Sequence, residues 1–257
     1  MKAPLPTLFL SHGSPMHALE PGAVGELWRD LGRRLPRPKA VLIVSAHWET
    51  DIPALTAATK PETIHDFYGF PQPLYQIQYP APGAPDVASR AMELLEKENL
   101  RAVADAQRGL DHGAWSPLLY MYPAADIPVV QVSVQTELGT RHHLALGRAL
   151  APLAHEGVLI LGSGHMTHNL GERSNGGPAA YVVEFQHWVK RRIEEHDLEG
   201  LADYRKLTPH GVRAHPTDEH FLPLFVALGA AREGYKAERL YDGVEMGSLA
   251  MDAYLFN

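Results

Sequence analysis

The chain has 257 residues, of which 15 are histidine and none is cysteine, and its 23 Lys and Arg against 30 Asp and Glu give a formal net charge of -7. The absence of cysteine excludes disulfides, thiolate zinc sites, iron–sulfur clusters and a cysteine nucleophile, so a metal would have to be held by histidine, carboxylate or water. The acidic balance argues against a nucleic-acid partner, and no apolar run approaches the roughly 20 residues of a membrane span, so we expect a cytoplasmic protein without a membrane partner.

Apolar segments of strand length alternate along the chain with amphipathic helical patterns. In chain order, we expect strands at Thr7–Ser11, Ala40–Ala46, Ile127–Val134 and Gly157–Leu161, and helices at Pro21–Leu35, Ala84–Glu98, Gly139–His155 and Ala179–His196. Near the end of the chain, Lys236–Tyr241 indicates an added edge strand. This alternation is typical of a mostly parallel sheet covered by helices on both faces. We therefore predict an α/β fold in a single domain, residues 1–257, with a functional site at the carboxyl ends of the strands.

One stretch departs from this alternation. Asp51–Pro85 is rich in Pro and aromatic residues and is too long for an ordinary connection in a compact domain. Loops of this kind are often lids or binding walls. Phe67, Tyr68 and Phe70 would then form a wall over a ligand, although the same aromatics could instead anchor the loop to the core.

Histidines follow several of the expected strands directly. His12 comes after Thr7–Ser11, His47 comes after Ala40–Ala46, and His168 lies shortly beyond Gly157–Leu161. Because the carboxyl ends of parallel strands meet at one edge of a sheet, such residues can lie side by side. Imidazole is the commonest metal ligand in proteins. The pattern is therefore compatible with a metal site, and equally with hydrogen-bonded histidines at strand ends.

The remaining histidines fall into two groups. His112 lies in a Gly-flanked loop, and His215 and His220 precede an apolar helix that opens at Phe221. Five others fall among charged neighbours in helical patterns, where we expect surface positions: His142, His143, His155, His187 and His196. No nucleophile elbow, Walker A motif or dinucleotide fingerprint is present.

Six motifs, in order along nearly the whole chain, closely resemble those of a known family. They are Leu10-Ser11-His12-Gly13-Ser14-Pro15-Met16, Ser45-Ala46-His47-Trp48, Ile64-His65-Asp66-Phe67-Tyr68-Gly69-Phe70-Pro71, Gly109-Leu110-Asp111-His112-Gly113-Ala114-Trp115, Gly162-Ser163-Gly164 with His168-Asn169, and the segment from His215 to Leu224. The family is the DODA-type extradiol aromatic ring-opening dioxygenases, within the class III (protocatechuate 4,5-dioxygenase-like) extradiol superfamily that includes the 4,5-DOPA dioxygenases.

The resemblance implies a mononuclear divalent metal and a reaction with O2. His12 and His47 resemble the two metal histidines of the family, and His220 resembles the third ligand, which is a glutamate in other branches of the superfamily. His168 resembles the acid–base histidine beside the metal. His112 resembles a catalytic histidine that contacts substrate. The implied metal is Fe(II) for turnover, with Zn(II) an alternative in the isolated protein because three neutral ligands suit it.

The substrate implied by the resemblance is a small catechol, opened with O2 to a muconic semialdehyde. His65, Phe67, Tyr68 and His215 are the candidate substrate-binding residues. Three assignments stay open at this point: Glu219 or His215 could be a ligand, His168 could be a fourth ligand, and His165 could take the place of His168 as the base. Two alternative functions are a zinc-dependent hydrolase and a non-catalytic metal-binding member of the same fold. A homo-oligomer is compatible with the sequence.

Overall fold

The computed structural model describes residues 3–257; Met1 and Lys2, with which the predicted domain begins, lie outside the described residues. Its centre is an eight-stranded sheet in the order β4-β3-β5-β2-β6-β1-β10-β7, and β8 pairs with β9 separately. The strands are β1 (Thr7–Ser11), β2 (Ala40–Glu49), β3 (Ala54–Thr56), β4 (Val103–Asp105), β5 (Val129–Val134), β6 (Val158–Gly164), β7 (Ala237–Tyr241), β8 (Val244–Glu245), β9 (Leu249–Ala250) and β10 (Ala253–Phe256).

The middle of the sheet is parallel. The neighbours β5, β2, β6 and β1 all run in one direction. At one side, β10 pairs antiparallel with both β1 and β7, and at the other side β3 is antiparallel to β5. The four strands expected from the apolar runs are confirmed, as is the edge strand near residue 240. Strand β2 continues to Glu49, however, so His47 lies within the strand and not beyond it.

The helices, like the strands, were predicted only in part. They are α1 (Gly22–Arg34), α2 (Pro85–Lys97), α3 (His112–Met121), α4 (Gly139–Leu150), α5 (Pro152–His155), α6 (Ala180–Glu194), α7 (Leu198–Ala202), α8 (Tyr204–Leu207), α9 (Gly211–Ala214) and α10 (Leu222–Ala230). The helix expected at Gly139–His155 is two helices, since Pro152 cannot continue the hydrogen-bond ladder of α4. None of the helices within residues 3–257 is long and apolar enough to cross a membrane.

Helix α3 corrects the expectation that His112 lies in a loop. His112 is the first residue of this helix, and the Asp111 side chain accepts a hydrogen bond from the amide of Ala114 as its N-cap. Eight of the ten residues of α3 are buried. Because a helix covered on nearly all sides has no polar face, the amphipathic period that reveals other helices is missing here.

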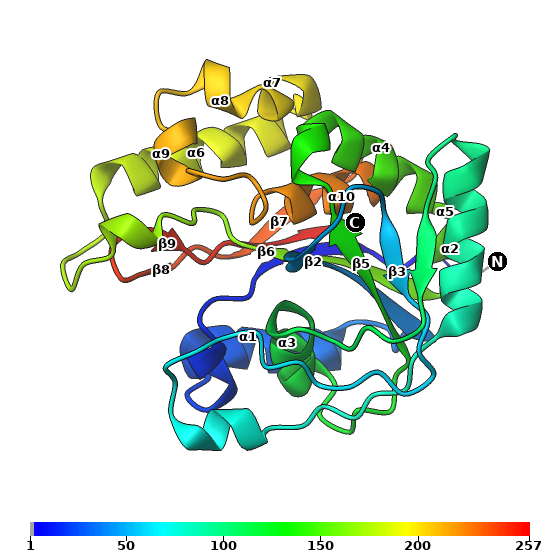
Figure 1. Ribbon diagram of the computed structural model, residues 1–257. Coiled ribbons are helices and arrows are strands. Elements are labelled where there is room, and N and C mark those ends of the chain that lie inside the picture. Colours follow the sequence, from blue (N-terminus) through cyan, green and yellow to red (C-terminus); the bar gives the residue numbers. More distant parts are fainter. Residues whose placement is uncertain (1–2) are drawn as a thin grey trace.

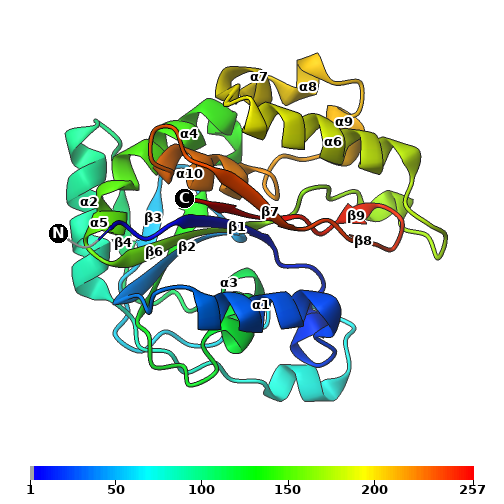
Figure 2. The same cartoon turned by 180° about the vertical axis from the view of Figure 1, so that it is seen from behind.

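Two helical layers cover the sheet. Helices α1 and α3 lie on one face, and α4, α6 and α10 lie on the other (Figure 1), as the view from behind also shows (Figure 2). The alternation along β1 sends Leu8 and Leu10 into the first layer's core and Phe9 into the second. This arrangement confirms the predicted α/β class with a mostly parallel central sheet flanked by helices.

Two glycines in β6 let α10 approach the sheet closely. A Cβ on Gly162 would clash with the carbonyl oxygen of Pro223, and one on Gly164 with that of His220. All nine residues of α10 are buried, and it packs on both α4 and β6. The start of α10 is thereby pressed against the carboxyl end of β6, and this contact carries His220 to that edge of the sheet.

The long segment 51–85 is anchored by its own polar groups and aromatics. The Trp115 indole N–H donates to the carbonyl of Ile64 at 2.8 Å, and the ring nitrogen Nε2 of His65 lies 3.0 Å from the carbonyl oxygen of Ile77. Phe67 is 6% exposed and packs 5.3 Å from the ring of Tyr75. The loop is thus held against α3, the helix that begins with His112.

One of the five histidines expected at the surface is buried, and that expectation was wrong. His143 is 0% exposed in α4: its Nδ1 lies 2.7 Å from the carbonyl oxygen of Gly139, and its Nε2 accepts from the amide of Gln135 at 3.1 Å. Burial lowers the pKa of His143 to about 3. His155, His187 and His196 are exposed, and His142 is half-buried.

The buried neutral state of His143 should make stability sensitive to acid. Its pKa is lower in the folded chain than the value of about 6.5 in an unfolded chain, so the stability it contributes is present above pH 6.5 and is lost as pH falls towards 3. For His143→Gln, we expect the fall in the free energy of unfolding between pH 6 and pH 4 to become shallower by about 1.4 kcal/mol per pH unit. Urea unfolding of metal-free protein measures this. The exposed His187→Gln should leave the slope unchanged, and an equal change in both variants would contradict the assignment.

Candidate metal centre

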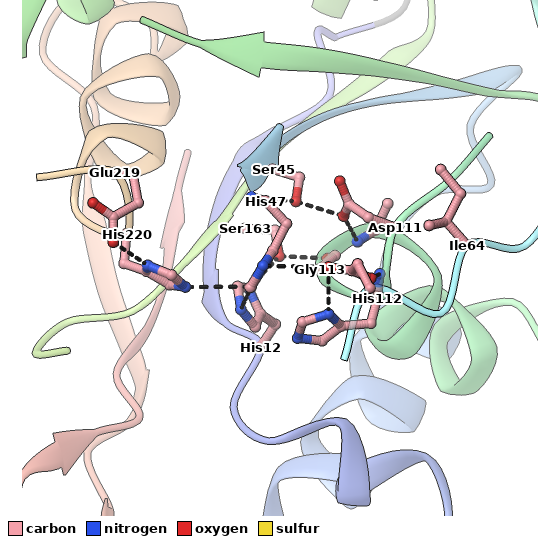
Figure 3. Close-up of polar contacts among 12 residues, drawn as sticks. His12, Ser45, His47, Ile64, Asp111, His112, Gly113, Ser163, Glu219 and His220 are labelled. Carbon is pink, nitrogen blue, oxygen red and sulfur yellow. Dashed lines mark hydrogen bonds and ion pairs between the residues drawn. The ribbon is translucent and has the colours of Figure 1, made fainter. Parts of the chain in front are cut away.

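Three imidazoles converge at the carboxyl edge of the parallel strands. His12 follows β1, His47 lies in β2, and His220 precedes α10, and Figure 3 shows the three rings meeting from these separate elements. The Nε2 atom of His47 is 3.0 Å from Nε2 of His12 and 3.3 Å from Nε2 of His220. These nitrogens could hold a metal ion together.

The other ring nitrogen of each of these histidines faces an acceptor. His12 Nδ1 is 3.0 Å from Ser163 Oγ, whose own proton is donated to the carbonyl of Gly113 at 2.5 Å. His220 Nδ1 is 2.9 Å from Glu219 Oε1. His47 Nδ1 is 3.3 Å from Asp66 Oδ2. Each Nδ1 therefore carries the proton, and each Nε2 presents its lone pair to the common centre.

This arrangement suits a cation. Burial first, and then the neighbouring imidazoles, hold the pKa values of His12, His47 and His220 well below their usual range, so all three rings are neutral at pH 7. Lone pairs that face one another at 3.0 Å repel unless a cation lies between them. Two nitrogens that each bind a zinc-like ion at about 2.0–2.1 Å lie roughly 2.9–3.4 Å apart, which agrees with the observed separations.

Asp66 links the candidate ligand His47 to His112. Its Oδ2 is 2.9 Å from His112 Nδ1, and its Oδ1 accepts from the backbone amide of the same residue at 2.9 Å, at the N-terminus of α3. Burial alone would raise the pKa of Asp66, but these bonds and the attraction of both histidines lower it to about 2. The carboxylate is therefore ionised and fixes two rings, leaving His112 Nε2 directed away from it.

A second carboxylate, Asp111, fixes α3 to the sheet. Its Oδ1 accepts from Ser45 Oγ at 2.7 Å, and its Oδ2 accepts from the Gln131 side chain and from Arg108 Nη2. Burial raises the pKa of Asp111, in spite of these donors. This network joins α3, β2 and β5. The sequence alone does not predict these roles, although Asp66 directly follows His65 and Asp111 directly precedes His112.

His168 lies beside the three-histidine group. Its ring stacks on His220 with a centroid separation of 3.4 Å and an interplanar angle of 16°. Burial, followed by the charges of His112 and Arg173, lowers the pKa of His168 to about 4. Its Nδ1 lies 4.0 Å from Glu219 Oε1, on the side away from His12 and His47. Glu219 therefore lies behind the two stacked rings, where it orients His220 Nδ1.

His165 and His215 have different surroundings from His168. The ring of His165 is 2% exposed and lies between the rings of His12 and His168, at 5.4 and 5.3 Å. His215 is 0% exposed, its Nε2 lies 2.8 Å from the carbonyl oxygen of Met166, and its ring stacks on Phe221 in an aromatic core. The structure does not bring His215 into the group, so its position supports neither a substrate contact nor a ligand role.

The other candidate substrate residues lie on the long loop. Phe67 packs edge-on to His112 with centroids 5.7 Å apart, and His65 packs against Phe67 at 5.8 Å. His65 and Phe67 therefore pack on the side of the site that carries His112. Tyr68, in contrast, is 91% exposed and makes little contact with the rest of the chain. Its neighbour Gly69 has a φ of 78°, which a residue with a side chain rarely adopts.

Comparison with known proteins adds evidence of descent. Residues 6–251 match the family described as the catalytic LigB subunit of aromatic ring-opening dioxygenase. A Beta vulgaris protein named 4,5-DOPA dioxygenase extradiol is 44% identical over 260 residues, covering 97% of this chain and 96% of its own length. The protein of the same name from Escherichia coli strain K12 is 41% identical, covering 96% and 93%. The crystal structure of an uncharacterized protein from Escherichia coli K12 superimposes with a TM-score of 0.84 at 36% identity, covering 98% of this chain and all (100%) of that chain.

The residues behind the candidate ligands should govern metal affinity. Removing the acceptor behind a ligand's Nδ1, or its negative charge, weakens metal binding by roughly 10–100-fold. We expect this for Ser163→Ala, which removes the acceptor, and for Glu219→Gln, which keeps an oxygen acceptor but loses the charge, measured by competition with a chelator. Ser116→Ala is the matched control, since Ser116 Oγ is buried and has no hydrogen-bond partner among residues 3–257. If Glu219→Gln abolished binding as completely as His220→Ala, Glu219 would be a ligand and not an orienting residue.

Proposed function

The chain belongs to the LigB family of aromatic ring-opening dioxygenases and is an extradiol dioxygenase; from this premise, we propose that it opens a catechol with O2 to a muconic semialdehyde at one divalent metal ion held by His12, His47 and His220. The observation that carries the proposal is the meeting of three Nε2 lone pairs, at 3.0 and 3.3 Å, beside two further imidazoles. The small-molecule partners are the catechol and O2.

The donor set fits the implied ion. Three imidazoles are neutral ligands, but the carboxylates of Asp66 and Glu219 lie directly behind two of them and return negative charge to the site. When bound, Fe(II) would supply Lewis acidity and one-electron chemistry with O2, whereas Zn(II) would supply only the former. We therefore propose Fe(II) for turnover and Zn(II) as an occupant that leaves the protein inactive toward O2.

We propose that His168 moves the catechol proton. Its lowered pKa keeps the ring neutral at pH 7, so a nitrogen lone pair is available to accept a proton from a catechol hydroxyl. Stacking on His220 holds the ring at the edge of the ligand group, within reach of a molecule bound there. The imidazolium formed when His168 accepts the proton can return that proton later to the opened product and become neutral again.

His112 serves a different purpose in this proposal. Asp66 holds its Nδ1 proton, so its Nε2 can meet an oxygen atom of substrate or O2. The ring lies 4.1 Å from His47 and 5.3 Å from His12, centroid to centroid, whereas His168 stacks on His220. His65 and Phe67 support it from the loop, and we propose that the exposed Tyr68 contacts the outer part of the substrate.

Catechol turnover tests the proposed reaction. Protein loaded anaerobically with Fe(II) should consume O2 and form a yellow ring-opened product with at least one member of a panel of acidic, amino-acid and alkyl catechols. Zn(II)-loaded protein should consume none. If no catechol supported O2 uptake while the Zn(II) form hydrolysed an ester or amide, the hydrolase reading would replace this one.

The assignment of His168 has its own test. Loss of a positioned acid–base group lowers the rate by roughly 10²–10⁴-fold. We therefore expect His168→Gln to lose kcat by this factor and to keep the metal-to-protein ratio of the unsubstituted protein. His12→Ala should instead lose the metal itself. The exposed His155→Gln is the control. Metal loss in His168→Gln would make His168 a fourth ligand, and a larger kcat loss in His165→Gln with metal retained would transfer the acid–base role to His165.

A further inference from the structure

The segment that carries His168 is not part of any strand. After β6 ends at Gly164, residues 165–169 cross the edge of the sheet before the short helix η4 (Leu170–Glu172). This segment runs beside the C-terminal segment that carries β8 and β9, and both views of the fold agree on this (Figures 1 and 2). The two segments are distant in sequence, so the contacts between them decide where His168 lies.

Thr167 makes the central contacts between the two segments. Its hydroxyl donates to the carbonyl of Ser248 at 2.8 Å and accepts from the amide of Ala250 at 2.7 Å. Both side chains, Thr167 and Ser248, are 0% exposed. One hydroxyl thus satisfies a donor and an acceptor of the C-terminal backbone in a place without access to water.

Other hydrogen bonds hold the neighbouring residues of the segment. Ser248 Oγ donates to the carbonyl of Asn169 at 2.9 Å, and Ser11 Oγ accepts from the amide of Met166 at 3.1 Å. From the opposite side, the amide of His168 donates to the carbonyl of Ala214 at 2.8 Å. The backbone around His168 is therefore fixed on both sides, with Thr167 at the middle of one side.

The C-terminal segment is itself anchored rigidly. The carboxylate of Asp252 is 0% exposed and accepts from Arg239 Nε at 2.7 Å and from Gln186 Nε2 at 2.6 Å, while its backbone carbonyl accepts from the amide of Ser11 at 3.1 Å. Strand β7, helix α6 and strand β1 all meet at this residue. The partner of Thr167 is therefore a fixed platform and not a mobile tail.

We propose that Thr167 is the positioning residue of His168: its hydroxyl, bonded to Ser248 and Ala250, sets the place of the His168 ring over His220. Thr167 precedes His168 directly, so a shift of its peptide moves the stacked imidazole with it. The inference rests on the proposed acid–base function of His168. Thr167 touches neither substrate nor ligand and acts only through its neighbour.

Valine is the informative substitution because it keeps the shape of threonine. Thr167→Val would leave the Ser248 carbonyl and the Ala250 amide buried without their partner, which is costly enough to displace the segment. Displacement by about 1 Å of a catalytic group can lower the rate by roughly 10²-fold. We expect kcat to fall by roughly 10–100-fold, with KM and metal stoichiometry unchanged. Thr167→Ser keeps both hydrogen bonds and should recover the rate.

Thr7→Val is the matched control for loss of stability. The Thr7 hydroxyl is also buried, at 2% exposure, and donates to the carbonyl of Ala227 at 2.9 Å, but it lies at the far end of β1 from His12. This variant should lose a comparable amount of stability and keep its kcat. Equal kcat losses in Thr7→Val and Thr167→Val, or failure of Thr167→Ser to recover the rate, would overturn the proposal.

A second readout does not depend on turnover. In the metal-free protein, the ring current of His220 should shift the NMR signal of the His168 Hε1 proton. Thr167→Val should move this signal toward the position of an unstacked histidine. Thr167→Ser and Thr7→Val should leave it in place. If Thr167→Val does not fold, Ser248→Ala, which removes only the bond to Asn169, should give a smaller shift in the same direction. An unmoved signal would overturn the proposal, whereas absence of catechol turnover in the unmodified protein would count against the proposed function alone.

Discussion

The site depends on the close approach of α10 to β6. Parallel strands bring His12 and His47 to one edge of the sheet, but His220 comes from a segment more than 170 residues further along and has no strand of its own. Gly162 and Gly164 have no side chains to hold α10 away, and the carbonyl groups of Pro223 and His220 occupy the space that a Cβ would fill. The third imidazole thus reaches the other two through a backbone contact that no larger residue at these two positions would permit.

Around this contact, hydrogen-bond acceptors fix the orientation of the imidazole rings. Four imidazoles have Nδ1 facing a neighbouring acceptor: a serine lies behind His12, a glutamate behind His220, and one aspartate is shared by His47 and His112. The neutral rings of His12, His47 and His220, together with the Asp66 carboxylate, whose pKa is lowered by its histidine partners, give an electrostatic environment that favours a cation at the centre. The orientation of these imidazoles is therefore set by Ser163, Glu219 and Asp66, which lie behind the rings.

Much of this could be predicted from the sequence, and the limits have physical causes. Apolar runs predicted the parallel strands, and the histidines at the ends of these runs indicated the edge of the sheet where His12 and His47 lie. The family resemblance, which the match over residues 6–251 confirms, indicated His220 and His168. Helix α3 was not predicted because a helix that is buried on nearly all sides shows no amphipathic period. The burial of His143 was not predicted because no local sequence pattern reports burial by residues distant in the chain. The roles of Ser163 and Asp66 as partners of the histidines were not predicted, because a hydrogen bond between residues far apart in the chain leaves no local sequence pattern.

The shared carboxylate of Asp66 connects the long loop with the candidate metal centre. It stands on the long loop next to Phe67 and Tyr68, yet it also holds the ring of His47 from behind. Under the proposed function, in which the loop contacts substrate and His47 binds the metal, divergence of the loop toward new substrates would be constrained at this one residue. A loop grafted from a relative would have to return an acidic side chain to the same point. Substrate range and metal retention in this chain would evolve together at Asp66 and independently elsewhere on the loop.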